Sequence, residues 1–259
     1  MPEIAVVTGA GSGLGRAIAR RLGAAGFAVV ATDVDHAAAR ETAGSIPGCR
    51  SAEHDVRDAE QHRRIAREAT ERGRLRVWVN NAGVLALGPA WTHPDAEVKR
   101  CVETNVLGTV HGSRAAVEVM RDQPGGGAVL NIASFAAFGA VPDLAVYSGT
   151  KHAVLGFTKS LNADLRNAGS RIRATVACLD GTDTPMVQRH AGDPKAGVLR
   201  HRGRLLDPDE VARHLVDALG SRRQVVCVPP ARGVAAQLLG LAPALSLRLT
   251  NAAARRHRT

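Results

Sequence analysis

Thr8-Gly9-Ala10-Gly11-Ser12-Gly13-Leu14-Gly15 connects an apolar run at residues 4–8 to a segment with helical periodicity at residues 16–25. Glycines allow the backbone to turn sharply and to approach a pyrophosphate, and a helix N-terminus offers that group free N–H donors and the positive end of a dipole. A glycine-rich string by itself could be a flexible turn. The order of strand, glycine turn and helix instead favours a loop that binds the pyrophosphate of a dinucleotide.

Short apolar, β-branched runs recur along the chain, separated by longer Ala-, Arg- and Leu-rich segments with helical periodicity. The runs are residues 4–8, 28–32, 77–79, 128–132, 172–177 and 225–228, with a weaker one at 50–54 that we place near a sheet edge. Alternating strands and helices indicate βαβ units and a parallel sheet covered on both faces. We expect one α/β domain at residues 1–230, followed by a basic extension at residues 231–259.

Composition excludes several classes of protein. The chain has 259 residues, of which 45% are hydrophobic and 22% charged, so it can bury a sizeable core and is not expected to be disordered. Four widely spaced cysteines and ten histidines form no C-x-x-C or H-E-x-x-H pattern, and we predict no metal site. The N-terminus lacks the features of a signal peptide and no run of about eighteen apolar residues occurs, so we expect a cytoplasmic protein.

Asp33 follows the second apolar run, eighteen residues beyond Gly15. In a dinucleotide-binding unit an acid near this spacing accepts hydrogen bonds from the adenosine ribose and repels a 2′-phosphate. Ser12 and Val34 occupy neighbouring positions where an arginine or lysine would be needed to bind that phosphate. These residues favour NAD over NADP.

The sequence resembles the classical short-chain dehydrogenase/reductase family from residue 4 to about residue 230. The glycine motif has the family's TGxxxGxG form, and five further signatures follow in family order. They are Asp55-Val56, Asn80-Asn81-Ala82-Gly83, Asn105, Ser134, and Tyr147-Ser148-Gly149-Thr150-Lys151. The resemblance implies a single Rossmann-type doubly wound domain with a seven-stranded parallel sheet. It also implies an NAD-dependent enzyme that interconverts a secondary alcohol and its ketone, as a homodimer or homotetramer built on the helices around Asn105 and Tyr147.

The resemblance further implies cofactor contacts along these motifs and after the sixth strand. They are Gly9, Gly11, Ser12, Gly13, Leu14, Gly15, Asp33, Asp55, Val56, Asn81, Ala82, Gly83, Tyr147, Lys151, Thr182 and Thr184. One segment departs from the family pattern, because Leu179-Asp180 replaces the usual Pro-Gly and its fixed turn geometry. Gly181 is the candidate to restore the bend one residue later.

Tyr147 and Lys151 stand four residues apart at the start of a helical segment, so their side chains share one face. A nearby ammonium favours the charged form of a phenol, and we expect the pKa of Tyr147 to lie below its usual value of about 10. By resemblance, Tyr147 is the general base or acid, Ser134 orients the substrate oxygen, Lys151 also binds the nicotinamide ribose, and Asn105 holds a water that relays protons to Lys151.

Apolar residues stand beside the motifs that line the family's substrate pocket. They are Leu85, Phe135, Val141, Leu144, Met186 and Val187. Although core packing explains any one of them equally well, together they favour a small hydrophobic alcohol or ketone over a sugar phosphate. Residues 188–207 are rich in Gly, His and Arg, and we expect a mobile loop that is either a lid or a plain surface connection.

The positive charge is concentrated near the C-terminus: the whole chain carries +10, of which residues 188–259 contribute +8. Residues 233–247 carry no charge, and Arg248, Arg255, Arg256 and Arg258 follow. We favour an arm that packs on another subunit or over the pocket, with peripheral membrane contact as the alternative. Without a recognition motif we expect no nucleic acid. An NADPH-dependent carbonyl reductase and a low-turnover cofactor-binding protein at membrane surfaces remain competing functions.

Overall fold

The computed structural model describes residues 1–193, 195–196, 199, 204–221 and 223–241. Seven strands form one sheet in the order β3-β2-β1-β4-β5-β6-β7, and every neighbouring pair is parallel. The strands are β1 (Glu3–Thr8), β2 (Ala28–Asp33), β3 (Arg50–Glu53), β4 (Arg74–Asn80), β5 (Ala128–Ile132), β6 (Arg173–Leu179) and β7 (Val225–Val228). The prediction of a doubly wound, seven-stranded parallel sheet with the weak third strand at an edge is confirmed.

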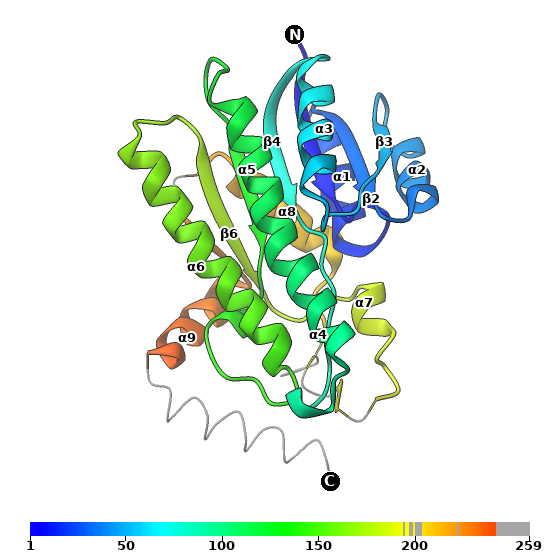
Figure 1. Cartoon of the computed structure of the whole chain (residues 1–259), viewed down its shortest axis with the longest axis vertical. Coiled ribbons are helices and arrows are strands. Elements are labelled where there is room, and N and C mark those ends of the chain that lie inside the picture. The colour runs from blue at the N-terminus through cyan, green and yellow to red at the C-terminus, as the bar shows by residue number, and fades with distance from the viewer. Residues whose placement is uncertain (194, 197–198, 200–203, 222, 242–259) are drawn as a thin grey trace.

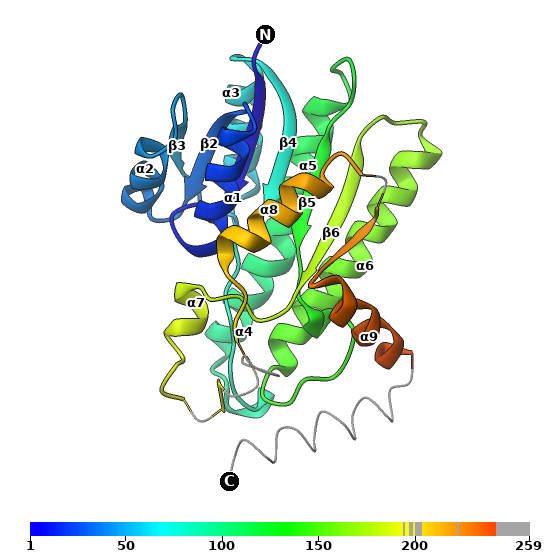
Figure 2. The same ribbon diagram turned by 180° about the vertical axis from the view of Figure 1, so that it is seen from behind.

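Helices cover both faces of the sheet. Figure 1 shows α3 (Ala59–Thr70), α5 (Gly108–Met120) and α6 (Ala145–Asn167) in front of it, and Figure 2 shows α1 (Gly13–Ala24) and α8 (Pro208–Ala218) behind it. The remaining helical elements are α2 (His36–Gly44), η1 (Ala90–Thr92), α4 (Asp95–Val102), η2 (Glu103–Leu107), η3 (Phe135–Ala137), α7 (Pro185–Gln188) and α9 (Pro230–Gly240).

The central strands are apolar on both faces because each face packs against helices. In β1, Ala5 and Val7 join the core cluster beneath α1 and α8, whereas Ile4 and Val6 join the cluster beneath α3 and α5. Trp78 of β4 is fully buried in the second cluster. The low aromatic content therefore produces an aliphatic core, in which one tryptophan occupies the largest volume.

The fourth strand is longer than its apolar run at residues 77–79. It begins at Arg74, which pairs in register with Glu3, and ends at Asn80. Arg76 interrupts the apolar pattern, but its guanidinium lies 3.3 Å from the Glu3 carboxylate and donates to the Gly125 carbonyl. Charged residues at this end of the strand are stabilised by these contacts, so hydrophobic periodicity alone underestimates its length.

Two segments singled out in the sequence are described only in part. The loop expected at residues 188–207 begins at the end of α7, and a parallel bridge joins Thr182 to Leu206. The prediction that this loop is a mobile lid concerns residues that are partly outside the described ones. The tail at residues 242–259 lies wholly outside them. Over the described residues, no helix is long and apolar enough to cross a membrane.

Two buried histidines pack against each other: His54 directly follows β3, and His62 lies on the buried face of α3. His54 is 1% exposed and His62 is 0% exposed, and their ring centroids are 4.2 Å apart. His54 Nδ1 lies 2.9 Å from Thr32 Oγ1, and His62 Nε2 lies 2.9 Å from the Val56 carbonyl. Burial lowers the pKa of His54 to about 3, and the neighbouring His62 and Arg64 lower it further. Burial also lowers the pKa of His62 to about 4, although its hydrogen bond with the Val56 carbonyl opposes the shift. Both rings are neutral at pH 7.

We expect this pair to make the protein sensitive to mild acid. Because the unfolded chain binds a proton at each histidine below about pH 6.5 while the folded chain does not, the free energy of unfolding should fall from pH 6.5 to about pH 4. Each histidine should contribute about 1 kcal/mol per pH unit to that slope. Denaturant unfolding across this range should show a shallower slope for His62→Gln than for the parent, because one of the two histidines that bind a proton on unfolding is gone. Equal slopes would contradict the assignment.

Candidate active site

A cavity of about 900 Å³ opens at the carboxyl ends of β1, β4, β5 and β6. The strand order reverses between β1 and β4, which is where ligands bind in open α/β sheets. Every residue predicted to contact cofactor or substrate lines this cavity. Asn105, the remaining predicted residue, lies behind its wall rather than on its surface. The fold thus brings together motifs that are more than 170 residues apart in the chain.

The glycine loop leaves no room for side chains. Gly9 has φ +63°, and a Cβ there would lie 2.8 Å from Ala82 Cα. A Cβ on Gly15 would collide with the Gly9 carbonyl oxygen. Helix α1 begins after Ser12, whose side chain makes no capping hydrogen bond to the described residues, so the first N–H groups of the helix are available to a ligand. This cradle fits a pyrophosphate.

The end of β4 is fastened to the glycine loop. Asn81 Nδ2 donates to the carbonyls of Thr8 and Gly9 at 3.0 and 3.1 Å, and the N–H groups of Asn81 and Ala82 both donate to Thr8 Oγ1 at 3.1 Å. Thr8 itself is 1% exposed. These contacts hold two cavity walls, from β1 and β4, at a fixed separation.

Carboxylates gather at the end of the cavity nearest β2 and β3. Asp33 Oδ2 accepts from the Gly11 N–H at 2.9 Å, and its Oδ1 accepts from the Asp35 N–H at 3.0 Å. Asp55 binds Arg57, with 2.6 Å between Oδ2 and Nη2, and this guanidinium lowers the pKa of the Asp55 carboxyl. Backbone N–H groups therefore hold the Asp33 carboxylate at the cavity surface. The Asp55 carboxylate is instead paired with the Arg57 guanidinium.

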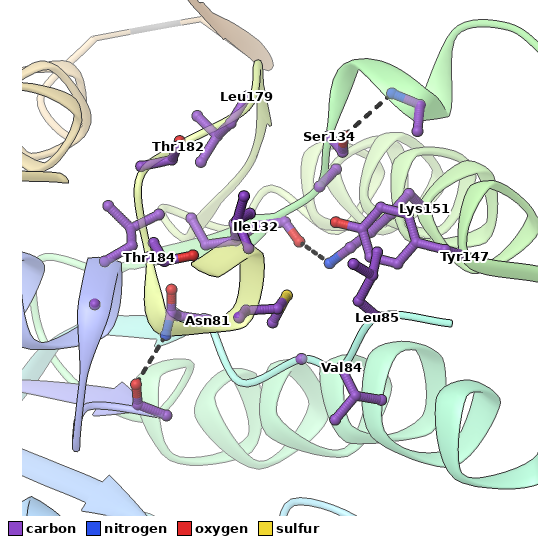
Figure 3. A pocket seen from close by; sticks show the side chains of 18 of the residues that line it. Asn81, Val84, Leu85, Ile132, Ser134, Tyr147, Lys151, Leu179, Thr182 and Thr184 are labelled. Carbon is purple, nitrogen blue, oxygen red and sulfur yellow. Dashed lines mark hydrogen bonds between the residues drawn. The ribbon is translucent and has the colours of Figure 1, made fainter. Parts of the chain in front are cut away.

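Ser134, Tyr147 and Lys151 meet on one side of the cavity, as Figure 3 shows. Ser134 begins η3 after the end of β5, and Tyr147 and Lys151 lie one turn apart on α6. The Ser134 hydroxyl accepts from the Ala136 N–H at 3.2 Å and is near enough to the Tyr147 phenol to lower the pKa of that group. Lys151 Nζ lies 5.5 Å from the centre of the Tyr147 ring and donates to the Ile132 carbonyl at 2.9 Å. The shared helix face predicted for Tyr147 and Lys151 is confirmed.

The expected lowering of the Tyr147 pKa is wrong for the chain described here. Burial of the phenol raises its pKa to about 12, although the nearby Ser134 hydroxyl opposes the shift. Burial also lowers the pKa of Lys151 to about 8. The helical spacing correctly predicts proximity, but it does not include desolvation, which disfavours the charged form of both side chains. At pH 7 the phenol is therefore a proton donor beside a lysine that is still mostly protonated.

Asn105 lies in η2, a π-helical turn between α4 and α5, and is fully buried. Its Oδ1 accepts from the Val84 N–H at 2.8 Å, and its Nδ2 donates to the Val84 carbonyl at 2.9 Å and to Thr150 Oγ1 at 3.0 Å. A Cβ on Gly83 would lie 3.2 Å from Asn105 Oδ1 and 3.7 Å from Lys151 Nζ. Asn105 thus fixes the segment at Gly83 and Val84, which lies between its own side chain and Lys151.

Apolar side chains also line the cavity. Among them are the six predicted residues, which are Leu85, Phe135, Val141, Leu144, Met186 and Val187. The sequence analysis missed a second group, from the C-terminal extension: Ala235, Ala236 and Leu239 of α9, with Arg232. Positions 232, 235, 236 and 239 follow the spacing of one helix face, which is the signal that could have identified this wall.

Gly181 has a packing role in addition to the bend predicted for it. Its φ is not in the left-handed region. A Cβ at this position would collide with the Leu199 carbonyl oxygen. Gly181 therefore permits the close approach of another backbone segment. The Asp180 side chain bonds to Arg232 of α9.

Comparisons with known proteins agree with this architecture. The sequence model of a family described as short chain dehydrogenase matches residues 3–195. The chain is 35% identical over 226 residues to 1-deoxy-11-beta-hydroxypentalenate dehydrogenase of Streptomyces exfoliatus, covering 85% of this chain and 80% of the relative. It is also 35% identical over 179 residues to diacetyl reductase ((S)-acetoin forming) of Staphylococcus epidermidis, covering 67% and 70%.

A solved structure resembles the whole domain. It is a short chain dehydrogenase/reductase from Burkholderia phymatum in complex with NAD, with a TM-score of 0.82, 29% identity and 92% of each chain covered. The sheet order, the glycine cradle and the ordered motifs agree with these similarities. The chain belongs to the classical short-chain dehydrogenase/reductase family, and is an oxidoreductase that acts on CH–OH groups.

Proposed function

We propose that the protein is an NAD-dependent oxidoreductase that interconverts a hydrophobic secondary alcohol and its ketone. The observation that carries the proposal is that Ser134, Tyr147 and Lys151 meet in the cavity that is also lined by the glycine cradle, by Asp33 and by apolar side chains. The cradle and Asp33 suit a dinucleotide, and the apolar side chains suit a hydrophobic substrate. A substrate carbon held beside Ser134 and Tyr147 would face both the cofactor and the phenol.

The bound nicotinamide would supply or accept the hydride. In carbonyl reduction, Tyr147 would donate its hydroxyl proton to the substrate oxygen, and in alcohol oxidation it would take that proton back. Ser134, which lies beside Tyr147 at the cavity surface, would hold the same oxygen and keep it within reach of the phenol. The raised pKa keeps Tyr147 protonated before reduction.

Lys151 and Asn105 support this proton transfer. The ammonium of Lys151 lies 5.5 Å from the Tyr147 ring and would stabilise the phenolate that forms when the proton leaves. Lys151 would also bind the nicotinamide ribose. Asn105 would hold the segment at Gly83 and Val84 in place, and a water bound there would connect Lys151 to solvent.

Asp33 supports NAD as the preferred cofactor. Its carboxylate is fixed at the cavity surface by two backbone N–H groups, and it would accept from the ribose hydroxyls and repel a 2′-phosphate. One observation favours the alternative, an NADPH-dependent carbonyl reductase: Arg57 also lines this end of the cavity. Because Arg57 is already paired with Asp55, we propose NAD.

Titration of both reduced cofactors by fluorescence tests this preference. The parent should bind NADH more tightly than NADPH, and Asp33→Asn should weaken NADH binding about tenfold and strengthen NADPH binding, because a charge-assisted hydrogen bond is lost and a repulsion is removed. Asp35→Asn is the matched control, since Asp35 also lines the cavity but caps α2 at Ala38. A parent that binds NADPH more tightly would contradict the proposal.

We also propose a homodimer or homotetramer. Val102 at the end of α4 and Leu107 at the end of η2 are 41% and 42% exposed, and both lie close in the chain to Asn105. Exposed apolar residues on neighbouring turns support a subunit contact. For the described part of the extension, residues 231–241, we propose packing on the domain, because α9 contributes a wall of the cavity.

A further inference from the structure

An ion pair joins the end of β6 to the beginning of α9. Asp180 Oδ2 lies 2.6 Å from Arg232 Nη1, and the other carboxylate oxygen accepts from the Gly181 N–H at 2.8 Å. The two side chains are 19% and 41% exposed, and both line the cavity. The acid stands where the family usually has a glycine, so the pair is a departure of this chain that the proposed roles of Tyr147, Ser134, Lys151 and Asn105 do not use.

Helix α9 has three different faces. One, with Arg232, Ala235, Ala236 and Leu239, lines the cavity. The second packs through glycines, because a Cβ on Gly233 would collide with Cys227 and a Cβ on Gly240 would collide with the Phe138 carbonyl oxygen. The third, with Val234, Leu238 and Leu241, is 59%, 62% and 82% exposed. Helix α9 thus separates the cavity from solvent. Its inner face includes two alanines, and its outer face is not covered by the described residues.

The ion pair fixes this wall relative to the reacting groups. The segment after Asp180 leads within four residues to Thr182 and Thr184, both at the cavity. Asp180 also anchors its own backbone, since its N–H donates to the Val228 carbonyl at 3.0 Å. Figure 2 shows α9 beside the carboxyl ends of β6 and β7. A shift of α9 would therefore change the space for the part of the substrate farthest from the glycine loop.

We propose that Asp180 and Arg232 are positioning residues that hold α9 as the substrate-side wall and thereby determine specificity for bulky apolar substrates. The inference rests on the proposed function. A partly exposed ion pair contributes little to folding, but a displacement of about 1 Å in a binding wall can change catalysis strongly. A substrate large enough to reach Ala235, Ala236 and Leu239 depends on the pair, whereas a small one does not.

Steady-state kinetics with one bulky and one small secondary alcohol, a steroid alcohol and butan-2-ol, test the proposal. Asp180→Asn keeps an acceptor for the Gly181 N–H but removes the charge, and Arg232→Gln removes the partner. Each change should raise KM for the steroid alcohol about tenfold. KM for butan-2-ol and the dissociation constant of NADH should stay within about twofold. The double variant should be no worse than either single variant, and Arg232→Lys should recover part of the loss.

The control is a second, more exposed ion pair whose residues do not line the cavity. Arg21 Nη2 of α1 lies 3.1 Å from Asp217 Oδ1 of α8, and these side chains are 43% and 54% exposed. Arg21→Gln and Asp217→Asn should shift the thermal unfolding midpoint as much as the test variants do, but leave both KM values unchanged. Equal changes for the two alcohols, or no change for either, would overturn the inference. A parent that oxidises neither alcohol would instead refute the proposed function.

Discussion

Replacing Tyr147 by phenylalanine is expected to reduce turnover by about 10² to 10⁴-fold, because a positioned proton donor contributes about that much to such reactions. Phenylalanine keeps the ring that packs over Lys151, whose Nζ lies 5.5 Å from the ring centre. NADH affinity should therefore remain within about twofold of the parent, and the unfolding midpoint should change little. Initial rates with a turned-over alcohol, together with NADH titration, measure both effects.

The chain offers an internal control for this experiment. Tyr147 is the sole tyrosine of the sequence, so ultraviolet difference titration follows its phenol alone. The parent should ionise well above pH 10, since burial raises the pKa of Tyr147 to about 12, and the Tyr147→Phe variant should show no signal. Turnover retained by the variant would remove Tyr147 from the proposed chemistry, even if the titration behaves as expected.

Gly9→Ala is expected to weaken NADH binding at least about 100-fold. The new Cβ would approach Ala82 Cα to 2.8 Å, and both segments are fastened together through Thr8 and Asn81. The loop and the end of β4 would have to separate, which displaces the N–H groups that meet the pyrophosphate. A misplacement of about 1 Å at such a site costs on the order of 10²-fold.

Gly169→Ala separates this collision from ordinary backbone strain. Gly169 has the same φ of +63° as Gly9, but a Cβ there meets nothing within 4 Å. Both substitutions cost about 1 kcal/mol for the left-handed conformation. Only Gly9→Ala also introduces a collision with a neighbouring segment. Calorimetric titration with NADH should show binding lost in Gly9→Ala and kept in Gly169→Ala. Similar binding by the two variants would contradict the role of the Gly9 approach.

Much of the fold could be predicted because strands buried on both faces are continuous apolar runs. Ile4–Val7 of β1 is such a run, and its alternate residues enter two separate core clusters. The candidate site could be predicted for a related reason. In a parallel sheet the loops that follow β1, β4, β5 and β6 meet at one edge, so motifs placed after these strands converge without any knowledge of side-chain contacts.

The remaining features depend on contacts between distant residues. Asp180 and Arg232 are 52 positions apart, and nothing in either neighbourhood indicates that they pair. The direction of the Tyr147 pKa shift also depends on burial, which the four-residue spacing to Lys151 does not contain. Hydrophobic periodicity likewise predicted only the apolar centre of β4, because the contacts that stabilise Arg76 come from Glu3 and Gly125.

The most direct test of the proposed function is oxidation of a panel of steroid, cyclic and acyclic secondary alcohols by the full-length protein, with NAD or NADP, followed by the absorbance of the reduced nicotinamide. We expect reduction of NAD with at least one apolar alcohol, at a higher kcat/KM than with NADP, and loss of the signal in Tyr147→Phe. No turnover with any alcohol or its ketone in either direction, or the same rate in Tyr147→Phe, would contradict it.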